Sequence, residues 1–300
     1  MEEGGTQRSE VLLFYRYVRV QDPTALADAI RSLCESRGLL GRILVAGEGV
    51  NGTLEGPTSD TSAFEEWLRT DPRFTTMSFK RSESGAAPAF RKLSVKVRDE
   101  IVGTHFDASI DPAKQTGKRL HAEELRGWYE SGKEFTILDM RNGYEYESGR
   151  FRDSINPGLG NSRDLPQALP RLEPYKDSTV LTVCTGGVRC EKMSAYLLEQ
   201  GFKDVYQLED GMHGYMQKYP GQDFEGALYT FDERVTMHFG GDREIVGRCR
   251  LCGAPTERYV NCANDECHLH FLVCGPCAGE GSPACSEGCR TVLRQSMIPS

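Results

Sequence analysis

The sequence predicts an α/β protein built from three parts, and three observations carry this prediction. Strand and helix patterns alternate through the first hundred residues, and a second series of apolar strands separated by helices runs to about residue 220. Eight of the 11 cysteines fall between Cys249 and Cys289. A chain of 300 residues is also longer than one small hydrophobic core needs, so more than one domain is expected.

The composition is that of an ordinary globular chain, with 38% hydrophobic and 27% charged residues. No run approaches the roughly 18 apolar residues of a membrane-spanning helix, and the run from Val11 to Val20 is broken by Arg16 and Arg19. The N-terminus has neither the basic nor the apolar part of a signal peptide. With a net charge of -8, these features disfavour a membrane protein, a secreted protein and a uniformly basic nucleic-acid coat. We therefore expect a cytoplasmic protein.

The first domain, expected at residues 1–108, has the β-α-β-β-α-β order of the ferredoxin-like fold. Its first helix begins with an Asp22 cap and Pro23, and its apolar spacing continues to a stop at Gly38. The second helix, expected at Thr58–Arg69, presents apolar residues on one face. Alternating apolar residues predict strands at Val11–Val18, Arg42–Ala46, Val50–Leu54, Met77–Arg81 and Leu93–Val97.

A second domain is expected at residues 120–222, after an irregular linker at Ile110–Arg119. Strands separated by helices predict a parallel sheet that is covered on both faces. The expected strands are Phe135–Met140, Thr179–Val183 and Val205–Leu208, and the expected helices are Ala122–Ser131 and Met193–Gln200. Residues 223–300 form the third part, which is rich in cysteine.

The segment Cys184–Lys192 (CTGGVRCEK) lies between an apolar strand and a helix. This junction is at the C-terminal edge of a parallel sheet, where such folds place their active sites. Its two glycines let several backbone N–H groups turn toward one sulfur, and the following helix adds its positive end. Together with Arg189, these groups predict a low pKa for Cys184 and hence a reactive thiolate or persulfide anion. The alternative, a structural cysteine before a glycine turn, is disfavoured by this whole context.

Two other isolated cysteines have simpler interpretations. Cys190 lies in the first helical turn, where it could resolve a persulfide or sulfenate on Cys184 as a disulfide, or serve as a small packing residue. Nothing in the sequence separates these two roles. Cys34 is expected to pack inside the first helix.

The loop Cys184–Arg189 resembles the six-residue active-site loop of rhodaneses. Leu138–Tyr146 (LDMRNGYEY), followed by Gly149–Phe151, is similar to the rhodanese segment in which an Asp-x-Arg strand end leads to a glutamate. Leu208–Met212 resembles the strand and glycine turn that close that domain. The resemblance covers about residues 120 to 220 and implies a rhodanese-like fold. It also implies supporting or substrate-orienting roles for Asp139, Arg141 and Glu145.

A closer resemblance, to the bacterial tRNA uridine hydroxylase family of rhodanese-domain proteins, covers most of the chain. It rests on four motifs in order: Gly47–Leu54 (GEGVNGTL), Lys96–Val102 (KVRDEIV), Cys184–Lys192 and Phe231–Val235 (FDERV). The resemblance implies oxygen-dependent 5-hydroxylation of uridine 34, with the tRNA anticodon loop and molecular oxygen as partners. By the same resemblance, Cys184 is the active-site cysteine of persulfide type.

The residues themselves explain a nucleophilic sulfur better than they explain oxygen activation. The six histidines form no evident triad of two His and one carboxylate for iron, and no GxGxxG motif follows a strand to bind flavin or nicotinamide. The sequence therefore identifies no redox cofactor. From the residues alone, the expected reaction is transfer of a sulfane sulfur through a Cys184 persulfide, which is the first alternative. The second is a zinc-stabilised protein-interaction or signalling module.

A locally basic stretch, from Lys80 to Arg119, opposes the acidic balance of the whole chain. It holds nine basic and five acidic residues, and Phe90 and Phe106 among them could stack on unpaired bases. The alternative is an ordinary solvated sheet face and linker. The residues predicted to bind RNA are Lys80, Arg81, Arg91, Lys92, Lys96, Arg98, Lys118 and Arg119.

The clustered cysteines form four pairs with metal-ligand spacing, enough for two tetrahedral, structural zinc sites. In a reducing compartment such clusters bind metal more often than they form disulfides. An iron–sulfur cluster is the other competing interpretation, and His268 or His270 could replace a cysteine. We expect cross-braced pairing, the first pair with the third and the second with the fourth. The pairs are Cys249 and Cys252, Cys262 and Cys267, Cys274 and Cys277, and Cys285 and Cys289.

Overall fold

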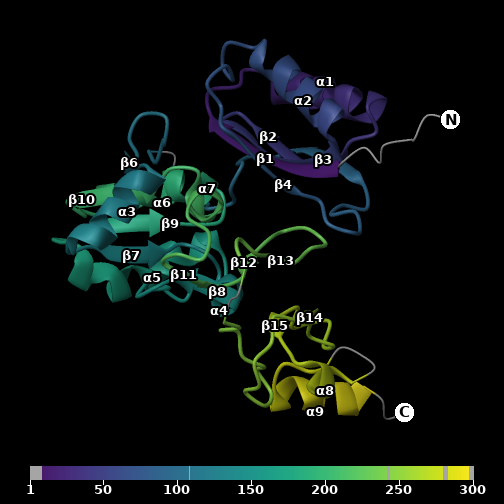
Figure 1. The fold of residues 1–300 in the computed structure, drawn as a ribbon, viewed down its shortest axis with the longest axis vertical. Coiled ribbons are helices and arrows are strands. Elements are labelled where there is room, and N and C mark those ends of the chain that lie inside the picture. The colour runs from purple at the N-terminus through teal and green to yellow at the C-terminus, as the bar shows by residue number, and fades with distance from the viewer. Residues whose placement is uncertain (1–8, 108, 242–243, 280–282, 297–300) are drawn as a thin grey trace.

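The computed structural model describes residues 9–107, 109–241, 244–279 and 283–296. Figure 1 shows three parts in chain order: a helix-covered sheet, a second sheet packed between helices, and a small C-terminal part. No helix in the described ranges is long and apolar enough to cross a membrane.

The N-terminal part is a five-stranded sheet in the order β4-β1-β3-β2-β5. β1 pairs antiparallel with β3 and β4, whereas β5 is parallel to β2. The first four strands confirm the predicted ferredoxin-like arrangement, and β5 extends the sheet at one edge. The elements are β1 (Ser9–Tyr17), α1 (Pro23–Ser36), β2 (Leu40–Ala46), β3 (Gly49–Pro57), α2 (Thr58–Arg69), β4 (Phe79–Glu83) and β5 (Leu93–Val97).

Both helices of this part lie on one face of its sheet, as Figure 1 shows. Alternate strand residues such as Phe14 and Ile43 point to the helices and join the buried core. The strand residues between them, among them Leu13 and Asn51, lie on the opposite face, which carries no helix of this part. We call this second face the open face, and it looks toward the rest of the chain.

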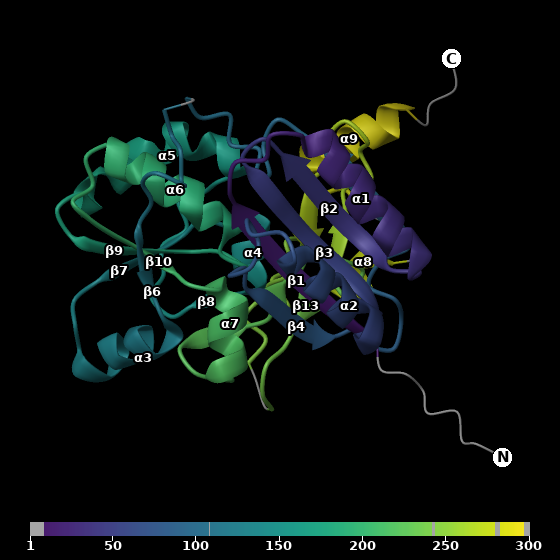
Figure 2. The ribbon, with the colours of Figure 1, turned by 90° about the horizontal axis from the view of Figure 1, so that it is seen from above.

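The central part is a parallel sheet in the order β6-β10-β9-β7. Figure 2 shows α5 and α6 on one face of it and α3 and α7 on the other, as predicted for a rhodanese-like domain. The elements are β6 (Lys118–Leu120), α3 (Ala122–Ser131), β7 (Thr136–Asp139), α4 (Gly143–Ser148), β8 (Gly149–Phe151), α5 (Leu165–Leu172), β9 (Thr179–Val183), α6 (Val188–Glu199), β10 (Asp204–Leu208), α7 (Gly211–Lys218) and β11 (Phe224–Gly226), with short 3-10 helices at Ser162–Asp164 and Glu173–Tyr175.

Two local predictions for this part were wrong. Lys118–Leu120 is not linker but an edge strand, because it pairs in parallel with Tyr206–Leu208. Three residues are too few to show the alternation that identifies a strand. Helix α6 begins at Val188 rather than Met193, since Gly187 already serves as its N-cap.

The C-terminal part is small, and a short hairpin precedes it. The hairpin and the residue before it contact both preceding parts of the chain. Glu233 N–H donates to the carbonyl of Ala89, in the loop between β4 and β5, at 2.9 Å, and Ala227 N–H donates to that of Ser148, at the end of α4, at 2.9 Å. The hairpin strands are β12 (Leu228–Tyr229) and β13 (Thr236–Met237), and the remaining elements are β14 (Tyr259–Asn261), β15 (His270–Leu272), α8 (Gly275–Ala278) and α9 (Glu287–Ser296).

Substitution of Gly52 tests how tightly the N-terminal core is packed. A Cβ at this position in β3 would lie 2.6 Å from Cζ of Phe14 and 3.0 Å from Cγ1 of Ile43. Both neighbours are fully buried, so Gly52→Ala overpacks the core and should lower the free energy of unfolding by about 1–3 kcal/mol. Urea unfolding measures this change.

Gly47→Ala is the control. A Cβ at Gly47 meets no heavy atom within 4 Å, so this variant should unfold close to wild type. Equal destabilisation by the two substitutions would show that the cost comes from the glycine backbone rather than from Phe14.

Candidate active site and metal-binding cysteines

Cys184 lies directly after β9, at the C-terminal edge of the central sheet, and is fully buried. The backbone N–H of Gly187 donates to its Sγ at 3.2 Å. Gly187 has a φ of 96°, a left-handed conformation that glycine adopts without steric cost. The backbone N–H groups of Arg189 and Cys190 also bond the sulfur. The loop and the start of α6 therefore surround Cys184 with donors suited to an anion.

The groups around Cys184 favour its thiolate. Burial by itself raises the pKa, but the Cys190 thiol, the Arg189 charge and the loop N–H groups together lower the pKa of Cys184 to about 6. Burial and the neighbouring sulfur raise the pKa of Cys190 well above its ordinary value. Cys190 therefore stays protonated and donates its S–H to the Cys184 thiolate.

Arg189 is held beside Cys184 by a buried carboxylate. Its Nη1 and Nη2 atoms donate to Glu145 Oε2 and Oε1 at 2.7 and 2.8 Å. Although burial lowers the pKa of Arg189, Glu145 raises it above its ordinary value. A planar, two-point contact of this kind fixes the guanidinium in place as well as keeping it charged. Glu145 is thus placed to position Arg189.

The structure does not bring Asp139 and Arg141 into contact with the cavity at Cys184. Both are fully buried, and Arg141 donates to Asp139 through Nε at 2.9 Å and through Nη2 at 2.6 Å. Arg141 also donates to the carbonyl of Gly149 at 2.7 Å. These contacts join the end of β7 to the end of α4, the helix that carries Glu145. The geometry favours a supporting role for this pair over a substrate-orienting one.

A cavity of about 350 Å³ lies between the Cys184 loop and the open face of the N-terminal sheet. The open face contributes Leu13, Arg42 and Asn51, while Phe231 comes from the turn between β12 and β13. The guanidinium of Arg189 lies 5.5 Å from the centre of the Phe231 ring. We call this space the thiolate cavity. Its walls come from both of the first two parts of the chain and from the hairpin.

A second cavity, of about 980 Å³, runs along β2 and β5 toward the C-terminal part. Arg42, Phe90 and Phe231 line both cavities, so the second one opens beside the first. We call the second cavity the groove. Its other walls include basic side chains of the N-terminal part and aromatic ones of the C-terminal part: Arg91, Lys92, Lys96, Tyr259 and His270.

Sequence reasoning missed two residues at the junction of these cavities. The sequence pattern identifies Arg42 only as part of a strand, although it is exposed and lies on the open face. Phe231 stands out only as part of a motif, and its side chain is 54% exposed. The signal available in the sequence was an aromatic residue at the start of a recognisable motif of otherwise mostly charged residues.

Four of the basic residues predicted to bind RNA are exposed at the β5 edge. They are Arg91, Lys92, Lys96 and Arg98. Arg91 is 83% exposed, although it pairs with Glu233 at 2.8 Å.

The other four lie elsewhere and have acidic partners. Lys80 is buried and pairs with Asp210 at 3.0 Å. Arg81, also in β4 at the opposite edge of the sheet, pairs with Glu10 and Glu65. Lys118 and Arg119 belong to β6 of the central sheet and pair with Asp204 and Glu191. Phe106 stacks on Tyr196 at 4.5 Å. The structure therefore does not unite the whole basic stretch.

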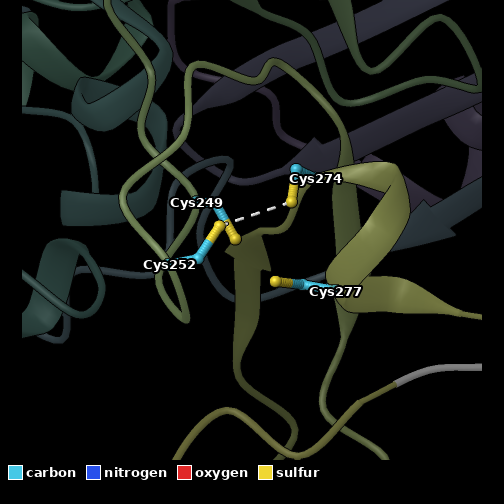
Figure 3. Close-up of side chains that lie close together, drawn as sticks. All are labelled: Cys249, Cys252, Cys274 and Cys277. Carbon is cyan, nitrogen blue, oxygen red and sulfur yellow. Dashed lines mark hydrogen bonds between the residues drawn. The ribbon is translucent and has the colours of Figure 1, made fainter.

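The eight clustered cysteines gather into two sets of four, and within each set the sulfur atoms lie within 4.8 Å of one another. Figure 3 shows the first set, in which Cys249 and Cys252 face Cys274 and Cys277. The second set is Cys262, Cys267, Cys285 and Cys289. The predicted cross-braced pairing is thus confirmed. All four positions of each set are cysteines, and His270 instead stacks on Tyr259 at 4.9 Å. Each set could hold a metal ion.

The Cys190 contact makes the reactivity of Cys184 testable. Because the pKa of Cys184 is about 6, its thiolate is present above that pH and disappears as the pH falls through it. Cys190→Ala removes one hydrogen bond to a charged group. The pH at which half of Cys184 is thiolate, the midpoint of its titration, should therefore rise by about one to two pH units. The measurement is the pH dependence of iodoacetamide labelling, read by mass spectrometry on the tryptic peptide 177–189, in which Cys184 is the only cysteine.

Cys190→Ser is the matched variant, because its hydroxyl can still donate to the thiolate. Its midpoint should therefore stay closer to that of wild type. An unchanged midpoint in Cys190→Ala would show that Cys190 does not lower the pKa of Cys184.

Three known domain families match successive stretches of the chain. The UPF0176 acylphosphatase-like domain matches residues 9–101, the rhodanese-like domain residues 121–218, and the rhodanase C-terminal family residues 225–290. These stretches correspond to the N-terminal sheet, the central sheet, and the hairpin with the cysteine-rich part.

Curated relatives match nearly the whole chain. A protein of Cytophaga hutchinsonii is 40% identical over 94% of this chain and 89% of its own length. A protein of Enterococcus faecalis is 39% identical over 88% and 84%, and one of Bacillus licheniformis is 40% identical over 93% and 86%. Each is named tRNA uridine(34) hydroxylase. The resemblance inferred from the four motifs is confirmed: the chain belongs to the tRNA uridine(34) hydroxylase family of rhodanese-domain proteins.

Proposed function

We propose that this protein hydroxylates carbon 5 of uridine 34 in the tRNA anticodon, in the cytoplasm, with Cys184 as the nucleophile. One observation carries the proposal: a cysteine with its pKa lowered to about 6 faces a cavity of about 350 Å³ that opens beside a basic groove. A site of this size suits one small ligand or nucleobase rather than a nucleic-acid helix.

The groove supplies a path for the RNA backbone and for unpaired bases. Arg42, Lys92 and Lys96 are exposed cations in its walls, suited to phosphates. Phe90 and Phe231 lie where the groove meets the thiolate cavity and can stack on bases. Bases of a single-stranded anticodon loop can be turned outward without opening a duplex. The target uridine would enter the thiolate cavity while its neighbours stay in the groove.

The reaction replaces the C5–H bond of uracil by C5–OH. Molecular oxygen would supply the oxygen atom, and a two-electron reductant with two protons would convert the second oxygen atom to water. In this scheme the Cys184 thiolate presents a nucleophilic sulfur to the base. Arg189 and the loop N–H groups stabilise negative charge at the sulfur, and Cys190 holds a proton beside it.

The same loop supports a second candidate, transfer of sulfane sulfur through a Cys184 persulfide. The ring of N–H donors around Sγ would stabilise a persulfide anion as well as a thiolate. A sulfurtransferase would convert thiosulfate and cyanide to thiocyanate and would leave the nucleosides of tRNA unchanged.

We further propose zinc as the ion in both cysteine sets. Four thiolates without an open position are the ligand set of structural zinc sites. The C-terminal part has a small apolar core, centred on Phe271 and Val273, so metal binding would contribute much of its folding free energy. The ions would thereby hold Tyr259 and His270 in the wall of the groove.

Cells lacking the protein test the main proposal. Their tRNA should lose 5-hydroxyuridine and nucleosides derived from it, as measured by mass spectrometry. Wild type should restore these nucleosides, and Cys184→Ser should not, because a serine hydroxyl is not ionised at neutral pH. Unchanged nucleosides together with thiosulfate:cyanide activity of the purified protein would favour sulfur transfer instead.

Reversing two charges of the groove tests the RNA path. Arg91→Glu combined with Lys92→Glu should weaken tRNA binding and reduce the salt dependence of log Kd by about 0.7 for each phosphate that the variant no longer neutralises. Lys203→Glu is the control, because Lys203 is 73% exposed and pairs with Asp177 on the central part. Equal weakening of tRNA binding in both variants would indicate a general charge effect rather than a groove.

Metal analysis tests the cysteine sets. The purified protein should hold about two zinc ions per chain, and Cys252→Ser and Cys289→Ser should each reduce this to about one. The two substitutions fall in different sets, so their effects should add. Iron with acid-labile sulfide would contradict the assignment.

A further inference from the structure

Asn51 belongs to the motif Gly47–Leu54, one of the four motifs by which the chain resembles its family. The structure places Asn51 on the open face of β3, in the wall of the thiolate cavity that also contains Cys184. An amide in this position faces whatever base the cavity holds. Its orientation decides whether it offers a donor or an acceptor.

A backbone carbonyl fixes the orientation of this amide. Nδ2 of Asn51 donates to the carbonyl oxygen of Ile101 at 3.1 Å. Because a carbonyl oxygen only accepts hydrogen bonds, the amide nitrogen must face Ile101. Oδ1 of Asn51 is therefore left as the acceptor of the side chain.

The carbonyl that orients Asn51 is itself held in place. The N–H of Ile101 donates to Glu48 Oε1 at 2.8 Å. The other carboxylate oxygen of Glu48 pairs with Lys192 of α6 at 2.8 Å. This chain of contacts connects Asn51 to the helix that begins at the Cys184 loop. A half-buried acceptor with this support is preorganised for one hydrogen-bond pattern.

We propose that Oδ1 of Asn51 accepts a hydrogen bond from N3–H of the uracil ring, and that this contact selects uracil over cytosine. Uracil carries a hydrogen on N3, whereas neutral cytosine has a lone pair there. With cytosine in the cavity, Oδ1 of Asn51 and N3 of the base would face each other as two acceptors without a hydrogen between them. In a partly desolvated cavity this costs binding free energy. The inference rests on the proposed function, because it specifies how the same cavity recognises its base.

The test compares three anticodon stem–loop RNAs that differ at position 34 by carrying uridine, 3-methyluridine or cytidine. The 3-methyl group replaces the hydrogen that Asn51 would accept. Wild type should bind the uridine RNA about tenfold more tightly than the other two, the range for one neutral hydrogen bond. Fluorescence anisotropy of dye-labelled RNA measures the three dissociation constants.

Two variants assign the discrimination to Asn51. Asn51→Ala should bind all three RNAs within about twofold of one another. Asn161→Ala is the matched control: Asn161 lines the same cavity, but its Oδ1 already accepts from Arg163 through N at 3.3 Å and Nε at 2.7 Å. Asn161→Ala should therefore keep the preference of wild type for uridine over 3-methyluridine.

The outcomes separate this inference from the proposed function. Equal binding of uridine and 3-methyluridine RNA by wild type overturns the role of Asn51 and does not depend on how any variant folds. An unchanged preference in Asn51→Ala also overturns it. In both cases hydroxylation of uridine-34 tRNA by wild type would leave the proposed function intact. If wild type neither binds nor hydroxylates any of these RNAs, the proposed function fails and the inference fails with it.

Discussion

An anionic sulfur buried at the end of β9 is the constraint on which the rest of this site depends. A buried charge without partners is costly, so the loop supplies N–H groups, Cys190 supplies a thiol and Arg189 supplies a positive charge. Arg189 is itself buried and needs Glu145. The end of α4, the helix that carries Glu145, is joined by Arg141 to the end of β7. The environment of one reactive sulfur thus involves β7, α4, β9 and α6, which are not all consecutive in the chain.

The same region also joins the first two parts of the chain. Tyr15 of β1 donates to Glu191 at 3.2 Å, and Lys192 pairs with Glu48 at 2.8 Å and with Glu100 at 3.3 Å. Lys192 is almost completely buried, and a buried charge that loses its partners is costly. These ion pairs therefore hold the open face of the N-terminal sheet against the Cys184 loop. They explain why motifs separated by more than a hundred residues belong to one recognisable set: all four border the thiolate cavity or support its walls.

The C-terminal part contributes a wall rather than a reactive group. Tyr259 donates its hydroxyl to the carbonyl of Tyr144 in α4, and its ring stacks on His270. This contact sets the cysteine-rich part against the helix that carries Glu145. The two cysteine sets lie on the same small core, so a metal ion in each would stabilise a surface that touches both the groove and the support of Arg189.

The sequence by itself determined those features of the fold and the site that depend only on residues close together in the chain. Alternation predicted the strands and their apolar faces, the strand–CTGGVR–helix context predicted a reactive Cys184, and the spacing of the cysteine pairs predicted two sets of four metal ligands. The spacing did not determine which pairs meet; the structure groups the first pair with the third and the second with the fourth. The tertiary structure alone decided that Arg42, Asn51 and Phe231 face that cysteine, that Lys80 is buried against Asp210, and that Lys118–Leu120 completes a sheet. The physical reason is the range of the interactions. Periodicity sets the backbone and shows which face is apolar, whereas the partner of each face depends on packing between residues far apart in the chain.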